Sequence, residues 1–229
     1  MNGPAAPGAV AARMPPQAPR AVIFDMDGLM LDTERLDRGL WQAAARRRGL
    51  DISDALYARL VGRRALDSER VLQEHFGPGL ALDDIRAEVL AHWRVHASSG
   101  LPRKAGLEPL LGTLERARIP LAVATSTARA KALVSLGPLA RHFQALACGD
   151  EVVHGKPAPD IFLLAAQRLG FAPGECLALE DSPAGVAAAV AARMPVIMIP
   201  DLVQPSCPVQ YLCGSLVEVA QWFQWRLAA

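Results

Sequence analysis

Long apolar runs, an excess of charge of one sign and closely paired cysteines are all missing from this sequence. The 24 basic and 23 acidic residues leave a formal net charge of +1, and no basic stripe is interleaved with aromatic residues. This balance argues against a nucleic-acid-binding protein. The most apolar stretch, residues 186–200, is interrupted by Arg193 and Pro195, so no run is long enough to span a bilayer. We therefore expect neither nucleic acid nor a membrane among the partners of this protein.

We expect no secretory signal either, because the first residues show no basic segment followed by an apolar core. The four cysteines, Cys148, Cys176, Cys207 and Cys213, show no C-x-x-C spacing, and most lie in or beside apolar segments. This pattern favours buried or incidental thiols in a reducing compartment, with a Cys207–Cys213 disulfide as the alternative. We expect a cytoplasmic protein.

What the chain does contain is enough apolar material for a full core, since 52% of its 229 residues are hydrophobic. Domain sizes of about 100–200 residues suggest one domain with a smaller insertion. Residues 1–19 are rich in alanine, proline and glycine and carry no periodicity, which predicts a disordered leader.

Short apolar runs that end in polar residues recur along the rest of the chain and predict β-strands. They lie at residues 21–24, 120–124, 145–148, 176–179 and 196–199. Helical patterns between them cover residues 107–118, 127–137, 158–169 and 183–192. Strands that alternate with helices of this length predict an α/β fold with a Rossmann-like, doubly wound parallel sheet. In such sheets, ligands bind beyond the carboxyl ends of the strands.

The first two predicted strands are separated by about 90 residues, whereas a crossover needs only a dozen or so. Apolar residues at helical spacing, such as Leu36 with Leu40, recur through this interval. We therefore predict a helical domain of residues 34–105, inserted into an α/β core domain of residues 20–33 and 106–229.

Two carboxylates, Asp25 and Asp27, stand where the first predicted strand opens into a turn at Gly28. Side chains two residues apart in a strand leave the same face, so both can point at one ligand. A carboxylate can act as a nucleophile toward a phosphoryl group if a second acid protonates the leaving oxygen. Like charges this close also call for a cation between them. Turn capping is the structural alternative, and the pair alone does not decide between the two.

Four motifs in order, each at a strand end, resemble those of the haloacid dehalogenase superfamily. The similarity is to the branch of β-phosphoglucomutase and pseudouridine-5′-phosphatase, and it runs from about residue 20 to the C-terminus. The motifs are DxDGxxxDT at residues 25–33, a strand ending in Thr125 and Ser126, GKPxPDIF at residues 155–162 and EDSxxG at residues 180–185.

The resemblance implies a role for each acidic residue of these motifs. Asp25 would be the nucleophile and Asp27 the general acid and base. Mg²⁺ would be held by Asp25, by the backbone carbonyl of Asp27 and by Asp181. Glu180 would assist through a water molecule or through contacts with the residues that bind the ion. Oxygen ligands of this kind also suit Mg²⁺ on general grounds.

The same resemblance implies a phosphate site made of neutral and cationic groups. Thr125 and the Ser126 amide would hold phosphate oxygens, and N–H groups near Gly28 would face the same anion. Lys156 would neutralise the charge that builds up during transfer. Taken singly, a threonine at a strand end is usually a cap and a lysine before proline is usually solvated.

Two positions bear on the reaction within this superfamily. Dehalogenases lack the second aspartate of the first motif, so Asp27 favours phosphoryl transfer. Mutases typically carry a histidine twelve residues after the nucleophile, where this chain has Asp37. The sequence thus resembles phosphatases of small phosphorylated metabolites, sugar or nucleoside monophosphates, with a phosphosugar mutase as the alternative.

The helical insertion would be the superfamily's mobile cap, which closes over the site and excludes water. Its loop at Arg63 and Arg64 would contact the substrate, although a solvent-facing helix start explains these arginines almost as well. A closing cap leaves little room for a phosphoprotein, so we expect a small molecule as partner. The apolar tail, residues 217–227, could pack internally or against a partner, which leaves a monomer or a homodimer open.

Overall fold

A single parallel sheet forms the centre of the computed structural model, which describes residues 14–15, 17–80, 82–205 and 209–228. Within these residues six strands follow the order β3-β2-β1-β4-β5-β6. They are β1 (Ala21–Phe24), β2 (Leu121–Thr125), β3 (Ala145–Cys148), β4 (Cys176–Glu180), β5 (Val196–Met198) and β6 (Tyr211–Leu212). The predicted doubly wound α/β fold is confirmed, and β6 adds a two-residue edge strand that the sequence pattern does not predict.

The central strands are short and apolar because helices cover both of their faces. Every residue of β1, β2 and β4 is buried, as expected for a parallel sheet inside an α/β protein. Phe24 pairs with Val123 on one side and with Leu179 on the other. This register brings the carboxyl ends of the three strands to one level, where the polar residues that follow them meet.

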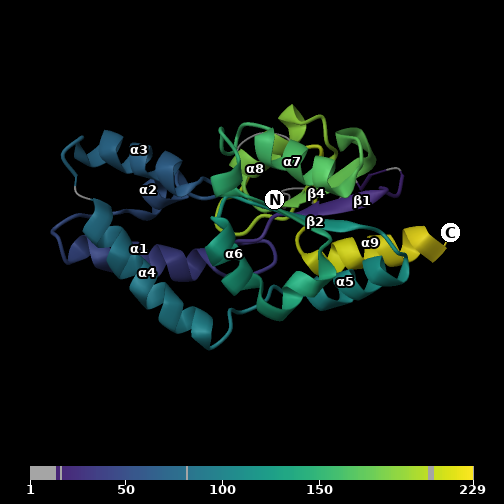
Figure 1. Cartoon of the computed structure of the whole chain (residues 1–229), viewed down its shortest axis with the longest axis horizontal. Helices are drawn as coiled ribbons and strands as arrows, with labels where there is room; N and C mark the ends of the chain where they lie inside the picture. The colour runs from purple at the N-terminus through teal and green to yellow at the C-terminus, as the bar shows by residue number, and fades with distance from the viewer. Residues whose placement is uncertain (1–13, 16, 81, 206–208, 229) are drawn as a thin grey trace, which may run out of the picture.

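Helices cover both faces of the sheet (Figure 1). Those packed against one face are α5 (Leu107–Arg116), α6 (Arg129–Leu136) and α9 (Leu216–Ala228), and those on the other are α7 (Asp160–Leu169) and α8 (Pro183–Ala191). Short 3₁₀ turns join them at η1 (Gly137–His142), η2 (Gly149–Glu151) and η3 (Pro173–Glu175). The apolar tail forms α9, and it packs inward, since Val219 and Phe223 are fully buried in the core.

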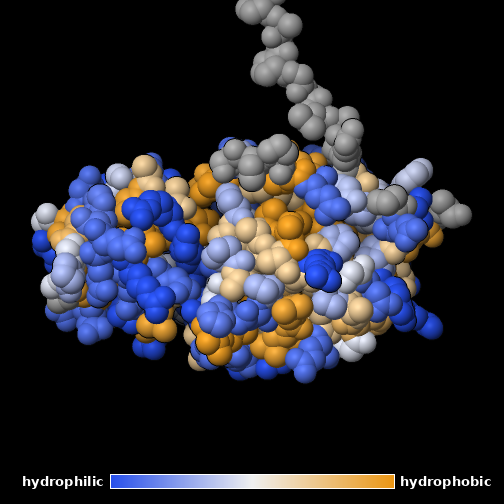
Figure 2. All heavy atoms as spheres, turned by 90° about the horizontal axis from the view of Figure 1, so that it is seen from above, coloured by the Kyte–Doolittle hydropathy of each residue, from blue (hydrophilic) through white to orange (hydrophobic). Residues whose placement is uncertain are grey.

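The remaining helices of the described residues lie together beside the sheet (Figure 1). They are α1 (Glu34–Arg46), α2 (Asp54–Ala58), α3 (Ala65–Phe76) and α4 (Leu82–Ser98). These helices share a hydrophobic cluster of their own, to which Leu56, Leu72 and Ile85 belong. Leu202 and Val203, in the loop after β5, also pack against this cluster. The surface of the helical part is mostly hydrophilic in Figure 2, whereas hydrophobic residues show more over the α/β part.

The two connections between the helical part and the sheet run side by side. The Asp32 amide donates to the Pro102 carbonyl at 2.9 Å, and the Lys104 amide donates to the Met30 carbonyl at 2.9 Å. Asp201, after β5, accepts hydrogen bonds from Arg35 at 2.7 Å and from the Lys104 ammonium at 2.8 Å. One buried carboxylate therefore ties both connections to the loop after β5.

Some predictions fall on residues outside the described part of the chain. The predicted leader is among them, because residues 1–13 and 16 are not described, and so is Cys207, with the disulfide considered for it. The other three cysteines are buried free thiols, as predicted. Over the ranges that the structure covers, none of the helices is long and apolar enough to cross a membrane.

Candidate active site

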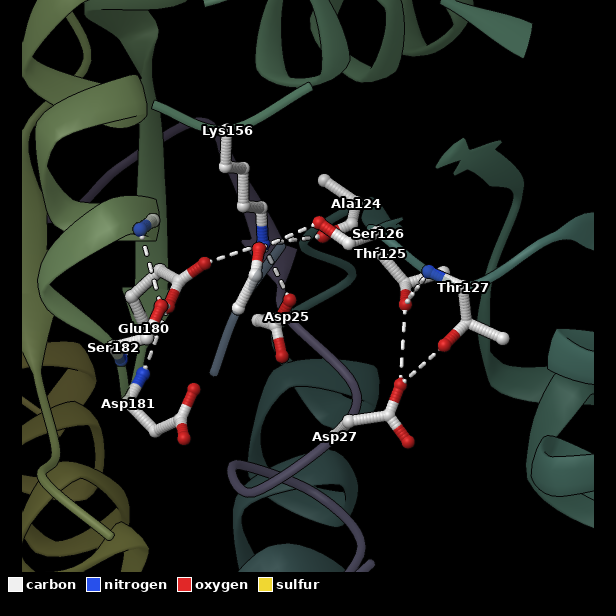
Figure 3. A network of polar contacts seen from close by, with 12 residues as sticks. Asp25, Asp27, Ala124, Thr125, Ser126, Thr127, Lys156, Glu180, Asp181 and Ser182 are labelled. Atoms are coloured by element: carbon white, nitrogen blue, oxygen red, sulfur yellow. Dashed lines mark hydrogen bonds and ion pairs between the residues drawn. The ribbon is translucent and has the colours of Figure 1, made fainter. Parts of the chain in front are cut away.

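A buried ammonium lies between two carboxylates at the carboxyl end of the sheet (Figure 3). Lys156 Nζ is 2.5 Å from Asp25 Oδ1, after β1, and 2.5 Å from Glu180 Oε1, at the end of β4. Its third hydrogen bond goes to the Ala124 carbonyl of β2 at 3.2 Å. Lys156 therefore fixes three strand ends relative to one another. Buried charges of this kind are stable only when they are paired and hydrogen-bonded.

Glu180 also organises the turn that follows β4. Its Oε2 accepts hydrogen bonds from the backbone amides of Asp181 and Ser182 at 3.0 and 3.1 Å and from the Ser182 hydroxyl at 3.1 Å. Gly185 is needed here because a Cβ at that position would overlap the Glu180 carboxylate. Both oxygens of Glu180 are thus engaged by protein groups, and its carboxylate positions the backbone of Asp181.

Asp25, Glu180 and Asp181 form an acidic cluster in which one oxygen of each lies within 4.8 Å of the others. Asp181 Oδ2 is buried and has no hydrogen-bond partner in the described part of the chain. Gly28, with a φ of 83°, lets the loop after Asp27 pass close to the Asp181 carboxylate, and a side chain there would collide with it. A buried acceptor without a donor, beside two more carboxylates, fits a divalent metal ion.

The titration behaviour of the cluster leads to the same conclusion. Burial, together with the charges of Glu180 and Asp27, raises the pKa of Asp25 to about 8, against the opposing effect of Lys156. Burial, followed by the charge of Glu180, also holds the pKa of Asp181 well above its usual range. Burial lowers the pKa of Lys156, but the charges of Asp25 and Glu180 outweigh this effect and raise that pKa above its usual value. The site has more negative charge than one lysine neutralises, and a cation would relieve it.

Asp27 is held differently, by three hydroxyl groups. Its Oδ1 accepts a hydrogen bond from Thr33 at 2.7 Å, and its Oδ2 accepts one from Thr127 at 2.8 Å and a longer one from Thr125 at 3.4 Å. Figure 3 shows Asp27 turned away from Lys156 and toward the residues that follow β2. The two aspartates of the first motif therefore have distinct surroundings, one ionic and one neutral.

A cavity of about 570 Å³ opens between the sheet and the helical part. Asp25, Asp27 and residues 125–127 lie on its sheet side. The opposite wall comes from α1 to α4 and the loops between them. The residues of that wall include acids, aromatic rings and arginines: Glu34, Asp37, Trp41, Tyr57, Arg63, Arg86, Trp93 and Arg94. A pocket of this size holds a small molecule of drug or metabolite size.

The structure brings most of the predicted site residues to this cavity or to its base. Ser126 lines it and donates its hydroxyl hydrogen bond to the Gly62 carbonyl of the helical part at 2.7 Å. Arg63 also lines the cavity. Arg64 does not: its guanidinium pairs with Asp67 at 2.9 Å and donates to the Val152 and Val153 carbonyls. Arg64 thus bridges the helical and α/β parts outside the cavity, because its side chain leaves the loop in another direction.

Several residues of the cavity were not predicted from the sequence. Thr127 holds Asp27, and its only sequence signal is its place two residues after the strand end. Glu34 is buried next to Tyr57, whose hydroxyl donates to it at 3.2 Å, and burial raises the pKa of Glu34 to about 8, with Asp27 and Asp37 adding to the effect. Trp41 and Trp93 sit in helical patterns that equally suit an ordinary hydrophobic core.

Comparison with known proteins then identifies the family. The profile of the haloacid dehalogenase-like hydrolases matches residues 19–193. The chain belongs to this family. Hexitol phosphatase A of Escherichia coli is 37% identical over 186 residues, which cover 79% of this chain and 82% of that protein. A probable pseudouridine-5′-phosphatase of Drosophila melanogaster is 36% identical over 197 residues, which cover 78% of this chain and 80% of that protein. The predicted enzyme class, a phosphoric monoester hydrolase of the haloacid dehalogenase type, is thereby confirmed.

Solved structures of this hydrolase family resemble the chain along most of its length. CbbY from Rhodobacter sphaeroides in complex with phosphate superposes with a TM-score of 0.75 at 26% identity, covering 88% of this chain and 96% of that one. A putative β-phosphoglucomutase from Thermotoga maritima gives a TM-score of 0.68 at 29% identity, covering 90% and 98%. The branch expected from the four motifs is confirmed by these neighbours.

Proposed function

We propose that this hydrolase is a Mg²⁺-dependent phosphatase that removes the phosphoryl group from a small metabolite, a sugar or nucleoside monophosphate, by way of a phosphoryl group on Asp25. The observation that carries the proposal is the position of Asp25, which faces the cavity beside Asp27 while Lys156 fixes its Oδ1 at 2.5 Å. The names of the relatives, hexitol phosphatase and pseudouridine-5′-phosphatase, support substrates of this size.

In the first step a carboxylate oxygen of Asp25 attacks the phosphorus atom, and the bond from phosphorus to the ester oxygen breaks. Asp27 gives its proton to that leaving oxygen, which departs as the free alcohol. Thr33 and Thr127 fix the Asp27 carboxyl group for this transfer. Thr125 and the Ser126 amide, together with N–H groups near Gly28, hold the phosphoryl oxygens.

In the second step Asp27, now a carboxylate, takes a proton from a water molecule that attacks the same phosphorus atom. The bond between phosphorus and the Asp25 oxygen breaks, which releases inorganic phosphate and restores the Asp25 carboxylate, while Asp27 again carries the proton for the next cycle. Lys156 offsets the negative charge near the phosphoryl group in both steps. The hydroxyl surroundings of Asp27 suit a group that must carry the proton in one step and lose it in the other.

The residues that would hold Mg²⁺ are the carboxylates of Asp25 and Asp181 and the backbone carbonyl of Asp27. Glu180 stays behind Asp181, since both of its oxygens already bind protein groups. When bound, the ion neutralises charge on the phosphate and keeps Asp25 ionised at neutral pH. The unpartnered Oδ2 of Asp181 supports this assignment.

We assign the role of a mobile cap to residues 34–105, on a core of residues 20–33 and 106–229. Closure would shut the cavity, exclude bulk water from the phosphoryl group and place Arg63 over the substrate. The hydrogen bond from Ser126 to Gly62 and the contacts of Arg64 with residues 152–153 support a closed arrangement. The enzyme acts in this proposal as a monomer or homodimer of the cytoplasm.

The test is phosphate release from p-nitrophenyl phosphate and from a panel of sugar and nucleoside monophosphates, with Mg²⁺ and with EDTA. We expect turnover that needs Mg²⁺ and that Asp25→Asn abolishes. Borohydride reduction of the quenched enzyme, followed by peptide mass spectrometry, should find homoserine at position 25 in the wild type alone. The matched control is Asp84→Asn, the same change at an exposed position of α4, which should turn over normally.

Two results would contradict the proposal. Full activity of Asp25→Asn would rule out a covalent step on Asp25, and full activity in EDTA would rule out a requirement for Mg²⁺. Interconversion of sugar phosphates that depends on a bisphosphate, without net release of phosphate, would favour the mutase alternative. Asp37 favours the phosphatase over that alternative, because the mutases that the sequence resembles typically carry histidine at this position.

A further inference from the structure

Arg64 connects the helical part to the segment of chain that carries Lys156. Its Nη1 donates to the Val152 carbonyl at 2.9 Å and to the Val153 carbonyl at 3.1 Å. These carbonyls lie four and three residues before Lys156. Arg64 is the residue before α3, in the helical part, whereas residues 152–156 lie between η2 and α7 of the α/β part. The contact therefore joins the two parts close to the buried ammonium in the sequence.

An ion pair holds the arginine in this direction. Its Nε and Nη2 donate to the two oxygens of Asp67 at 2.9 and 3.4 Å, so one edge of the guanidinium binds the carboxylate and Nη1 is left for the two carbonyls. Only 14% of the Arg64 side chain and 17% of the Asp67 side chain are exposed. The planar fork of an arginine can make both sets of bonds at once, whereas the ammonium of a lysine is a single point of charge.

Gly155, the residue directly before Lys156, makes room for this ion pair. A Cβ at position 155 would overlap the Arg64 Nε and the Asp67 carboxylate. The α/β part supports the same segment through Asp160, which accepts a hydrogen bond from the His154 amide at 3.2 Å. The backbone that leads into Lys156 is thus held from both sides, and the helical part supplies one of the two supports.

Lys156 depends most on this backbone while phosphorus is bonded to Asp25. In the structure, the charges of Asp25 and Glu180 hold the ammonium at 2.5 Å from each. Once an Asp25 oxygen is bonded to phosphorus, Asp25 no longer carries the charge that attracts Lys156. The ammonium then stays beside the phosphoryl oxygens only if residues 155–156 stay in place. A catalytic group that is misplaced by 1 Å can cost about 100-fold in rate.

We propose that Arg64 is a positioning residue for Lys156: together with Asp67 it fixes residues 152–155 while the helical part is docked, and it thereby makes the placement of the lysine depend on closure. When the helical part moves away, its arginine leaves with it and the segment loses one of its supports. Closure then acts on the transfer step itself, in addition to excluding water. This inference rests on the proposed phosphatase function and adds a residue that does not touch the substrate.

The kinetic test compares Arg64→Met and Arg64→Lys with the wild type on p-nitrophenyl phosphate in Mg²⁺. We expect Arg64→Met to lower kcat about 10- to 100-fold and to change KM less than about threefold, because the misplaced group acts in the transfer step and not in binding. Arg64→Lys keeps the charge without the fork, so it should recover part of the loss. It also keeps the test informative if Arg64→Met does not fold.

Hydrogen exchange of the same variants gives a measurement that does not depend on turnover. With Mg²⁺ and orthovanadate present, we expect a peptide of residues 149–156 to exchange about tenfold faster in Arg64→Met than in the wild type, because two hydrogen bonds from a charged group are lost. Peptides from β1 should keep the wild-type rate. Arg59→Gln is the matched control, since Arg59 pairs with Glu74 at 3.5 Å and is half exposed; it should change neither kcat nor exchange.

Two results would overturn the inference. A rise in KM with an unchanged kcat in Arg64→Met would make Arg64 a docking contact alone, and exchange of residues 149–156 at the wild-type rate would show that Arg64 does not hold the segment. A wild type that releases no phosphate from p-nitrophenyl phosphate would refute the phosphatase function instead. The exchange rates would in that case still decide whether Arg64 fixes the segment, so the two failures are distinguishable.

Discussion

At the carboxyl ends of the strands, Lys156 and Glu180 have their hydrogen-bonding groups occupied by other protein groups. Across the cavity, Asp37 and Trp93 each keep one buried polar atom that finds no partner among the described residues. Both sides contain charged groups removed from water. On the sheet side, the strands hold these groups in place and they satisfy one another. On the helical side, long side chains reach into the cavity from four helices.

In the proposed function, the groups on the sheet side carry out the reaction and those on the helical side recognise the substrate. A group that must attack or donate a proton works best when the fold has already oriented it, because no reorganisation is then needed during the reaction. A wall that recognises a substrate gains from polar groups that only the right ligand completes, since a wrong ligand leaves them unpaired. Asp181 Oδ2 is the exception on the sheet side, and a metal ion would complete it.

The largest effect should come from Lys156→Met, which removes the cation that the buried carboxylates surround. Leaving Asp25 and Glu180 without their partner should lower the free energy of unfolding by about 3–5 kcal/mol and abolish turnover. Urea denaturation and phosphate release measure the two effects. Lys104→Met is the control, because the Lys104 ammonium is partly exposed and its buried partner Asp201 keeps a second ion pair, with Arg35; this change should cost about 1 kcal/mol or less. Equal losses in the two variants would refute a sheet side held together by buried charge.

A smaller, pH-dependent effect should come from Glu34→Gln, at the border between the two sides. Burial raises the pKa of Glu34 to about 8, above the 4.5 of an exposed glutamate. Between these values the folded protein holds a proton that the unfolded chain has lost, so wild-type stability falls as the pH rises through this window. Glutamine removes this penalty.

The variant should therefore match the wild type near pH 4.5 and exceed it by about 1–3 kcal/mol above pH 8. Urea denaturation from pH 4.5 to 9 in EDTA measures the difference. Glu74→Gln, at an exposed position of α3, should show no such trend. A constant difference at all pH values would show that Glu34 is ionised in the folded protein.

The smallest effect should come from Thr127→Val, which removes one of the hydroxyls that hold Asp27. We expect kcat for an alkyl phosphate to fall about tenfold, since one hydrogen bond to a charged group is lost. For p-nitrophenyl phosphate the loss should be smaller, because its leaving oxygen needs little protonation. Thr113→Val, which removes a buried hydroxyl of α5 far from the cavity, is the control. An equal loss on both substrates would place Thr127 at the phosphate and not at the acid.

The sheet side could be predicted almost entirely from the sequence. Strands buried on both faces leave continuous apolar runs, and the polar residue after each run marks the strand end, as Asp25 does after β1. Those ends meet because parallel strands share one direction. Four short motifs were therefore enough to anticipate the cluster of Asp25, Lys156, Glu180 and Asp181.

The helical side could not be predicted in the same way. Trp41 and Trp93 obey the same helical spacing as residues of the hydrophobic cluster, and spacing does not say whether a buried face meets another helix or a cavity. Arg63 and Arg64 are neighbours in sequence, yet only Arg63 reaches the cavity. The pairing of Asp37 with Lys131 joins residues 94 positions apart, and no local pattern reveals it.

The loop after β5 limits how the helical insertion of this protein can be exchanged in evolution. Leu202 and Val203 pack against the hydrophobic cluster of the helical part, and Asp201 holds the side chains of Arg35 and Lys104. The helical part thus depends on a third segment, almost a hundred residues beyond the last point at which the backbone joins the two parts. A helical insertion borrowed from a relative would not fit this sheet unless that loop came with it.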